Sequence, residues 1–416
     1  MKNYLEKLLK QAKAASFKLA GLTTAQKNRA LKNMAKALLA NRKFILNQNK
    51  KDLVRASADK EKSQFIDRLS LNNKRIKEMS DSLLAVAALQ DPVGRVFYQN
   101  VRPNRIKIQK IRVPVGVVLI VYEARPNVTS DCIGLLFKSS NVGILRGSKG
   151  AFYSNQAIAK VLNRAIESSR IDFKPFFVVS KLDHKTVDLL LKQDAYIDMV
   201  IPRGGESLIR QVAKTSTIPV IKHYKGVCHI FVDASADQPK ALKICLNAKV
   251  QRPSVCNAVE TILVDEAIAS EFIPLLKKEL DRFKVEIRAD QRSRKIISSL
   301  KKAKEADWSS EYLGLIVSLK VVKNISQAIE HVNKYGSRHT DSIITRDKAN
   351  AEKFLKQVDS ACCFLNISTR FSDGYQFGLG AEIGISTDKL HARGPMGLEE
   401  LTTYKWIARG NGQIRK

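Results

Sequence analysis

Long apolar runs, paired cysteines and repeated segments are all missing from this chain of 416 residues. Because no apolar run could cross a bilayer, we expect no membrane-spanning helix. The N-terminal stretch has no signal cleavage site and predicts a basic amphipathic helix that belongs to the fold. The six cysteines have no paired spacing, which favours reduced thiols and a cytoplasmic protein over a disulfide framework.

Acidic residues are also scarce. Asp and Glu number 40 against 72 Lys and Arg, so the formal net charge is +32. A surplus of this size is one sign of nucleic-acid binding. The basic residues are spread along predicted helices, however, and no RNA-binding or helix-turn-helix signature accompanies them. We therefore do not expect nucleic acid as the main partner, and a basic surface that attracts anionic small molecules is the simpler interpretation.

The chain does have the composition of an ordinary folded protein, with 44% hydrophobic and 27% charged residues, at a length that predicts two or three domains. Up to about Asp91 the pattern is helical, and Asn72 is placed to cap one helix. Two apolar stripes at helical spacing are Leu31, Met34, Ala35, Leu38 and Leu39, and Ile76, Met79, Leu83 and Val86. From Gly94 to Pro114 the pattern predicts a hairpin, which either forms a simple sheet edge or meets another subunit.

After Pro114, buried strands alternate with helices as far as Tyr224. This alternation predicts an α/β fold with a doubly wound, largely parallel sheet. Such sheets bind ligands at the carboxyl ends of their strands. The three loops expected there are YEARPN (residues 122–127), LRGSKGA (145–151) and IPRGGESL (201–208).

Two of these loops have the residues of a phosphate site. Arg146 and Lys149 stand beside two glycines in the second loop, and Gly204 and Gly205 open a predicted helix in the third. Glycines let backbone amides approach a phosphate, and cations neutralise it. Neither loop has the G-x-G-x-x-G fingerprint, and FGLGAEIGIS, which starts at Phe377 and is one residue off that spacing, is interpreted as an irregular loop. Together the two loops favour an anionic dinucleotide.

A second α/β block begins at Cys228 and contains the stretch QRPSVCNAVET, residues 251–261. This stretch places Cys256 after a proline-bearing turn and immediately before an apolar strand, Ala258 to Val264. A thiol at the mouth of a strand can be presented to a substrate, although most single cysteines are small buried hydrophobic residues. The local pattern leaves both interpretations of Cys256 open.

Seven stretches carry a resemblance to a known family: PVGVVLIVYEARPNVTSD, VGILRGSKGA, DMVIPRGGESLIR, PVIKHYKGVCHIFVD, QRPSVCNAVETILV, YGSRHTDSIITRD and FGLGAEIGISTDKLHARGPMGLEELTTYKW. They resemble the gamma-glutamyl phosphate reductases, also called glutamate-5-semialdehyde dehydrogenases, within the aldehyde dehydrogenase superfamily. The resemblance covers nearly the whole chain and is weakest in the N-terminal helices.

The resemblance implies an NADPH-dependent reduction of L-glutamyl 5-phosphate to L-glutamate 5-semialdehyde, the second step of proline synthesis from glutamate. Cys256 matches the nucleophile of the family, whose thiolate expels phosphate and forms a thioacyl enzyme that is then reduced by hydride. Asn127 resembles the superfamily's side-chain donor to the oxyanion, beside the backbone amide of Cys256. The alternative role of Asn127 is to serve the turn after Pro126.

One departure from the oxidising aldehyde dehydrogenases favours reduction. Those enzymes carry a glutamate that activates water, and the aligned positions here are Lys222 and His223, with no carboxylate. A reductase that must protect its thioester from hydrolysis should lack that base. Oxidation of an aldehyde by NAD(P) remains the alternative activity, and a basic nucleic-acid-binding protein on the same fold is the alternative from another class. His223, Cys228 and His229 have no paired ligand spacing, so we expect no metal.

The resemblance also assigns the residues that bind the cofactor. Arg146 corresponds to a lysine that contacts the adenosine ribose, and Lys149 lies about where NAD-preferring relatives have an acid. The absence of that acid favours NADPH over NADH. Ser148 of the same loop, with Gly204 and Gly205 of the next, completes the predicted cofactor set.

Three further residues are predicted to contact the ligands. Glu311 resembles the glutamate that holds the nicotinamide ribose, and its alternative interpretation is an exposed acid at a helix end. Arg125 and Arg370 are candidates for contact with the phosphate or the α-carboxylate of the substrate.

The fold of the superfamily implies two Rossmann-like α/β lobes and a small oligomerisation hairpin. The predicted domains are residues 1–98 and 114–227 for NADPH binding, 228–395 for catalysis, and 99–113 and 396–416 for the oligomerisation hairpin and C-terminal tail. We expect a homo-oligomer, either a dimer or a tetramer, with a functional link to glutamate 5-kinase.

Overall fold

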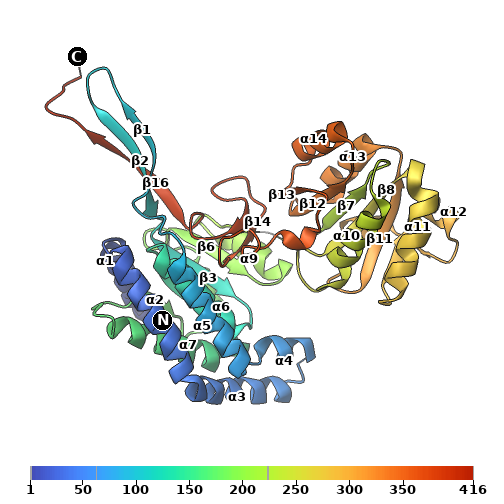
Figure 1. The fold of residues 1–416 in the computed structure, drawn as a ribbon. Helices are drawn as coiled ribbons and strands as arrows, with labels where there is room; N and C mark the ends of the chain where they lie inside the picture. The colour runs from blue at the N-terminus through green and yellow to red at the C-terminus, as the bar shows by residue number, and fades with distance from the viewer. Residues whose placement is uncertain (1, 62, 223, 416) are drawn as a thin grey trace. The chain divides into compact units, whose positions relative to one another are not determined.

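The computed structural model describes residues 2–61, 63–222 and 224–415, which form two compact units (Figure 1). The first unit comprises the chain up to Lys222, together with Gly378–Gly384 and the segment from Met396. The second unit comprises the intervening chain up to Phe377, together with Ile385–Pro395. Each unit is therefore built from segments that are distant in the sequence.

Five helices open the first unit: α1 (Lys2–Ala20), α2 (Thr24–Ala40), α3 (Arg42–Ala58), α4 (Ser63–Leu69) and α5 (Asn73–Ala88). Asn72 caps α5 as predicted, because its side chain accepts a hydrogen bond from the backbone N–H of Arg75 at 2.8 Å. The two predicted apolar stripes are buried, with one exception. Leu39 is 38% exposed, since adjacent residues of a helix point about 100° apart and Leu38 already faces the core.

A parallel sheet of four strands follows, in the order β5 (Phe176–Val178), β4 (Val142–Gly147), β3 (Val117–Tyr122) and β6 (Met199–Arg203). The connecting helices are α6 (Pro126–Lys138), α7 (Phe152–Glu167) and α8 (His184–Leu190), and α9 (Glu206–Thr215) follows β6. Helix α6 begins at Pro126, because proline suits the first helical position. Tyr122 pairs in register with both Gly147 and Arg203, so the three strands end at one edge.

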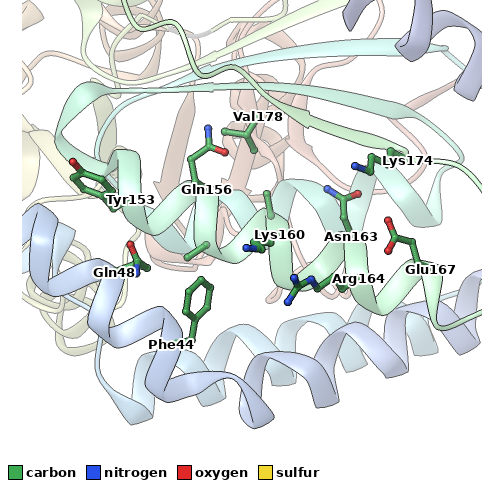
Figure 2. Close-up of a pocket in the computed structure, with 12 residues that line it drawn as sticks. Phe44, Gln48, Tyr153, Gln156, Lys160, Asn163, Arg164, Glu167, Lys174 and Val178 are labelled. Carbon is green, nitrogen blue, oxygen red and sulfur yellow. The ribbon is translucent and has the colours of Figure 1, made fainter.

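A cavity of about 540 Å³ lies between α3 and α7 in this unit (Figure 2). Its lining includes Phe44 and Gln48 from α3 and Tyr153, Gln156 and Lys160 from α7. None of the predicted site residues lines it. The cavity is therefore separate from the loops at the carboxyl edge of the sheet.

The predicted hairpin consists of β1 (Val96–Val101) and β2 (Lys107–Pro114), which pair antiparallel. A third strand, β16 (Thr402–Arg409), pairs antiparallel with the other edge of β2. Figure 1 shows this three-stranded sheet extending away from the helices of the first unit. No local pattern predicted that the C-terminal strand would join the hairpin.

The second unit has a parallel sheet of seven strands, in the order β10-β9-β11-β8-β7-β12-β13. The strands are β7 (Cys228–Val232), β8 (Val259–Asp265), β9 (Glu286–Ala289), β10 (Lys301–Lys302), β11 (Ile316–Val322), β12 (Thr340–Ile344) and β13 (Cys362–Leu365). The helices are α10 (Gln238–Val250), α11 (Glu266–Asp281), α12 (Gln291–Ile296), α13 (Ile325–Tyr335) and α14 (Lys348–Gln357).

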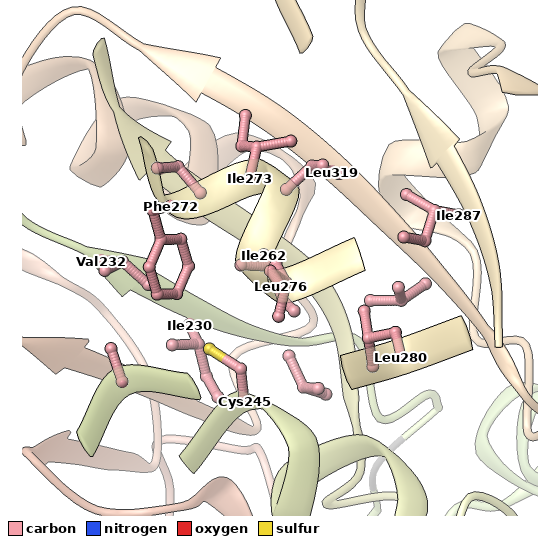
Figure 3. Close-up of a cluster of buried hydrophobic side chains, with 14 of the residues drawn as sticks. Ile230, Val232, Cys245, Ile262, Phe272, Ile273, Leu276, Leu280, Ile287 and Leu319 are labelled. Atoms are coloured by element: carbon pink, nitrogen blue, oxygen red, sulfur yellow. The ribbon is translucent and has the colours of Figure 1, made fainter. Parts of the chain in front are cut away.

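Apolar side chains cover both faces of this sheet. On one face, Ile230 and Val232 pack with residues of α10 and α11 such as Cys245 and Phe272 (Figure 3). On the other face, Phe231 packs with residues of α13 and α14. Because successive side chains of a strand point to opposite faces, β7 is buried from both sides and holds its end loops rigidly.

The remaining elements are short. They are three 3-10 turns, η1 (Lys149–Ala151), η2 (Glu305–Ser309) and η3 (Thr369–Phe371), and the strand pair β14 (Gly384–Ser386) and β15 (Gly394–Met396). The segment from Phe377 to Ser386 is irregular up to β14, which agrees with its interpretation as a loop and not a dinucleotide fingerprint. Within the described ranges, no helix is long and apolar enough to span a bilayer.

Candidate active site

Cys256 lies in the short loop that joins α10 to β8. The backbone N–H of Ala258 donates to the carbonyl of Val255 at 3.1 Å, so Cys256 and Asn257 are the central residues of a tight turn. The Cys256 thiol is half-buried and forms no disulfide. The turn thus presents the thiol at the amino end of a fully buried strand.

Other cysteines are in environments that keep the thiol protonated. Burial raises the pKa of Cys132 to about 12 and that of Cys363 to about 11. Burial also raises the pKa of Cys228 and of Cys245 well above the usual range. Since the thiolate is the nucleophilic form, these four residues are unsuited to nucleophilic attack.

Two residues just before and at the start of β7 hold the backbone of Cys256. The Cys228 thiol donates a hydrogen bond to the carbonyl oxygen of Cys256 at 3.2 Å. Gly226 packs so closely that a Cβ on it would lie 2.0 Å from the same oxygen. Because the obstructing atoms are backbone and cannot turn aside, only glycine fits at position 226.

Arg370, in η3, lies against the Cys256 loop. Its Nε donates to Oε1 of Gln251 at 2.8 Å, and its guanidinium also bonds Oδ1 of Asn257. Burial, and secondarily the neighbouring Arg252, lower the pKa of Arg370. Arg370, predicted to bind the substrate, is therefore hydrogen-bonded to residues on both sides of the predicted nucleophile Cys256.

Glu311 is joined to the same loop through Gly226. Oε1 of Glu311 accepts a hydrogen bond from the backbone N–H of Gly226 at 2.9 Å. Gly226 in turn abuts the backbone of Cys256. One glycine thus connects the predicted nucleophile with the residue predicted to hold the nicotinamide ribose.

These residues meet at the amino edge of the second sheet. Cys256 precedes β8, Gly226 precedes β7 and Glu311 precedes β11. The three strands are adjacent and parallel, so their amino ends lie side by side. The rule that ligands bind at carboxyl ends, which guided the prediction for the first sheet, does not extend to this edge.

In the first unit, the end of β4 and the loop after it carry the predicted cofactor residues: Arg146 lies on β4, and Ser148 and Lys149 follow it. Arg146 donates to the carbonyl of Leu182 at 2.6 Å, and burial lowers its pKa. Nε of Arg146 and Oγ of Ser148 are buried and make no hydrogen bond within the described residues. Two unsatisfied donors beside the exposed Lys149 are the chemistry that an anionic cofactor requires, so these residues fit such a group.

In the loop after β6, by contrast, the predicted backbone donor is already hydrogen-bonded within the protein. Gly205 is the N-cap of α9, and its backbone N–H donates to Oε1 of Glu123 at 2.9 Å. A Cβ on Gly204 would lie 2.6 Å from the carboxyl carbon of Glu123. The Gly205 amide, which was predicted to approach a phosphate, therefore already has an anionic partner in the protein, and no sequence pattern indicated this contact with Glu123.

Asn127 and Arg125 lie at the start of α6. Asn127 is in the first turn, and its Nδ2 donates to Oδ2 of Asp131 at 3.1 Å. An amide nitrogen carries two hydrogens, so this bond leaves one for an oxyanion. Arg125 occupies the N-cap position without a side-chain cap. Burial raises the pKa of Asp131 to about 6, and no sequence pattern had marked this residue as a partner of Asn127.

The structure thus groups the predicted residues unit by unit. Cys256, Glu311 and Arg370 meet in the second unit, and the remaining predicted residues lie at the carboxyl edge of the first sheet. Lys222 is half-buried, and His223 lies outside the described residues. No group of three or more His, Cys, Asp or Glu side chains in the described part of the chain could hold a metal ion.

Comparison with known proteins shows which family this chain resembles over most of its length. The aldehyde dehydrogenase family model matches residues 2–307. The chain is 52% identical to the gamma-glutamyl phosphate reductase of Caldanaerobacter subterraneus subsp. tengcongensis, with 98% of each chain covered. It is 50% identical to the protein of the same name from Geobacter metallireducens, with 97% of each chain covered.

Solved structures agree with these relatives. The crystal structure of gamma-glutamyl phosphate reductase from Thermotoga maritima superposes with a TM-score of 0.97 at 44% identity, with 99% of each chain covered. An acetylating aldehyde dehydrogenase from Geobacillus thermoglucosidasius, at 17% identity and a TM-score of 0.70, shares the fold. The match covers 100% of this chain and 98% of the Geobacillus chain.

Proposed function

This chain belongs to the aldehyde dehydrogenase family, and we propose that it reduces L-glutamyl 5-phosphate to L-glutamate 5-semialdehyde and phosphate in the synthesis of proline from glutamate. The observation that carries the proposal is identity of about half the residues, over nearly the whole chain, with relatives of that name. The half-buried thiol of Cys256, held by its backbone in a rigid turn, supplies the nucleophile that the reaction needs.

The first step is attack of the Cys256 thiolate on the acyl carbon of the substrate. The sulfur–carbon bond forms, the carbon–oxygen bond to phosphate breaks, and phosphate leaves. The backbone N–H of Cys256 and the side-chain amide of Asn127 are the proposed donors to the oxyanion. Arg370, and Arg125 with it, are the proposed cations for the phosphate and the α-carboxylate of the substrate.

The second step reduces the thioester on Cys256. When bound, the nicotinamide cofactor that the family implies would supply the hydride that reduces the acyl carbon. The resulting thiohemiacetal collapses, and the Cys256 thiolate leaves as the aldehyde forms. Position 222 carries lysine, so no carboxylate at that position is available to activate water against the thioester.

We propose NADPH as the cofactor. Arg146, Ser148 and Lys149 would bind the phosphate-bearing ribose, because two of them offer buried donors without partners and the third is an exposed cation. Gly204 and Gly205 would pass close to the cofactor, beside Glu123. Glu311, oriented by the N–H of Gly226, would hold the nicotinamide ribose.

The protein is proposed to act in the cytoplasm as a homo-oligomer, a dimer or a tetramer, with a functional link to glutamate 5-kinase. The three-stranded sheet of β1, β2 and β16 supports self-association, because it exposes four aromatic side chains. These are Phe97, Tyr98, Tyr404 and Trp406, all between 43% and 55% exposed.

The experiment that tests the function runs the reaction backwards. Glutamate 5-semialdehyde and NADP are supplied, and formation of NADPH is followed with and without phosphate. We expect turnover only with phosphate, which is the acyl acceptor in this direction. Turnover that ignores phosphate would instead identify an aldehyde-oxidising enzyme. The nucleic-acid-binding alternative would require tight, steeply salt-dependent binding to nucleic acid.

A further inference from the structure

The second unit contains a buried ion pair that the reaction does not use. Nζ of Lys249, near the end of α10, lies 2.5 Å from Oε2 of Glu260 on β8, and both side chains are fully buried. Burying two charges is expensive even when they are paired, and an apolar pair of similar volume is often at least as stable. A pair in this place therefore calls for a role besides stability.

The hydrogen bonds of the pair connect two segments of the candidate active site. Nζ of Lys249 also donates to the carbonyl of Val259, three residues after Cys256. The other carboxylate oxygen of Glu260, Oε1, accepts from the backbone N–H of Leu313, two residues after Glu311. Lys249 thus holds the first residue of β8, directly after the Cys256 loop, and Glu260 holds the Glu311 segment.

Leu313 needs such an anchor. Its φ is +52°, in the left-handed region that a bulky residue rarely adopts, and its side chain is 43% exposed. Packing of the side chain therefore does not keep this backbone in place. Strained backbone of this kind persists only where its surroundings hold it, and the bond from Leu313 N–H to Glu260 is such a restraint.

The preceding residue, Tyr312, also lies beside the ion pair. Lys249 Nζ lies 5.9 Å from the ring centroid of Tyr312, and the Tyr312 hydroxyl bonds Ser318 on β11. Glu311 is therefore followed by two residues that both contact the pair. Glu311 also accepts a hydrogen bond from Gly226, which abuts Cys256.

We propose that the Lys249–Glu260 pair is a positioning device that fixes the Glu311 segment relative to the Cys256 loop. The proposal rests on the roles proposed above for Cys256 and Glu311. Neither Lys249 nor Glu260 touches the reacting atoms. The pair acts through the Leu313 amide and the Val259 carbonyl, and so sets the position of the nicotinamide ribose relative to the thiol.

Two double variants isolate the contact with Leu313. K249M/E260Q and K249M/E260L both remove the buried charges, but only glutamine retains a carbonyl oxygen that can accept from the Leu313 amide. We expect similar melting temperatures. We expect kcat with glutamate 5-semialdehyde, NADP and phosphate to be about 10- to 100-fold lower in K249M/E260L, since small misplacements at a reacting centre have effects of this size. The KM for NADP should rise in the same variant.

Alkylation of Cys256 tests whether a lower kcat reflects a displaced Glu311 segment or an altered thiol. The rate at which iodoacetamide modifies Cys256 should differ by less than about threefold between the two double variants, because each keeps the turn and its contacts with Gly226 and Cys228, which set the exposure of the thiol. K27M/D91N is a matched control, since Lys27 and Asp91 form a buried ion pair in the first unit at 2.6 Å. It should lower the melting temperature without a selective change in the KM for NADP.

The proposal is overturned if the two double variants have equal kcat and equal KM. Hydrogen exchange in the wild-type protein tests it even if the leucine variant does not fold. The Leu313 amide should be protected, and exchange as fast as that of an unstructured chain would also overturn the proposal. Failure of the proposed function is distinguishable, because the wild-type protein itself would then lack phosphate-dependent turnover.

Discussion

At the scale of single residues, the position of the thiol depends on a residue that has no side chain. Gly226 packs its Cα against the backbone of Cys256 and gives its N–H to Glu311. The sequence offers no sign of this, because a lone glycine before a strand is common and both contacts are formed across the fold. The Cys256 stretch, in contrast, was recognisable from its turn and its strand.

Replacing Gly226 by alanine tests that packing. The added Cβ would lie 2.0 Å from the carbonyl oxygen of Cys256, so the turn must shift. We expect kcat to fall about 100-fold and the free energy of unfolding to fall by about 1–3 kcal/mol, measured by steady-state kinetics and urea unfolding. Gly21→Ala is the control, since its Cβ meets its nearest neighbour at 3.4 Å. Unchanged kinetics in Gly226→Ala would contradict the close packing.

Replacing Cys256 by alanine tests the covalent mechanism. We expect no turnover with glutamate 5-semialdehyde, while NADPH binding, measured by fluorescence titration, is retained because the thiol is not a cofactor ligand. Cys363→Ser is the matched control. Burial raises the pKa of Cys363 to about 11, so this thiol is not a nucleophile near neutral pH and its loss should leave turnover intact. An active alanine variant at position 256 would refute the mechanism.

At the scale of elements, helix α13 buries a histidine in its neutral form. His331 is 3% exposed, Nζ of Lys320 donates to its Nδ1 at 3.1 Å, and its ring packs against Trp308 and Tyr335. Burial, followed by the neighbouring His229 and Lys320, lowers the pKa of His331 to about 2. The folded protein therefore keeps this ring neutral throughout the mildly acidic range.

This burial predicts a dependence of stability on pH. In the unfolded chain a histidine has a pKa of about 6.5, so below that pH the unfolded state binds a proton that the folded state does not, and stability falls as the pH falls. Between pH 6.5 and 5 the free energy of unfolding should fall by about 1.5–2 kcal/mol because of His331, since the slope is half-maximal at pH 6.5 and approaches about 1.4 kcal/mol per pH unit below it. Urea unfolding of the wild-type protein and of His331→Phe at both pH values measures it. His184→Gln, at an exposed position, should keep the wild-type dependence, and an equal dependence in all three would refute the assignment.

The cap of α5 is a second property of an element, and here the sequence sufficed. Replacement of Asn72 by alanine removes its 2.8 Å bond to the N–H of Arg75 and should lower the free energy of unfolding by about 1 kcal/mol. Lys74→Ala, at an exposed position of the same helix, should change it by less than about 0.5 kcal/mol. Urea unfolding measures both, and an equal loss in the two variants would contradict the cap.

At the scale of the whole molecule, the sheet of β1, β2 and β16 is the proposed surface for self-association. The Phe97 and Tyr404 rings are 5.9 Å apart and the Tyr98 and Trp406 rings 5.7 Å apart, so the exposed aromatics form two pairs across strands that are distant in the sequence. Clustered apolar side chains of this kind indicate an interaction site more strongly than single ones do.

Tyr98→Ser combined with Trp406→Ser should therefore lower the molar mass in solution, measured by light scattering after size-exclusion chromatography. The loss of one aromatic pair removes apolar area that association would bury. Phe17→Ser, which replaces an aromatic that is 73% exposed on α1, should leave the molar mass unchanged. An oligomer that persists in the double variant would show that this sheet is not the interface.

The sequence alone determined the α/β class, the family and the reaction, and these predictions are confirmed. Hydrophobic period and turn chemistry are local properties, so buried strands, capped helices and the Cys256 turn could be recognised along the chain. The domain boundaries and the roles of the site residues that were inferred from the sequence remain predictions. One local inference was wrong at Leu39, where helical spacing alone did not define the width of the buried face.

Only the tertiary structure decided what holds the thiol in place. Gly226, Cys228 and the Lys249–Glu260 pair reach the Cys256 loop or the Glu311 segment from other strands and helices, across as many as 85 residues of sequence. It also decided that the loop sits at the amino edge of its sheet and that β16 completes the hairpin. Such contacts follow from strand order and register, which are settled by packing of the whole unit and leave no periodic signal in the sequence.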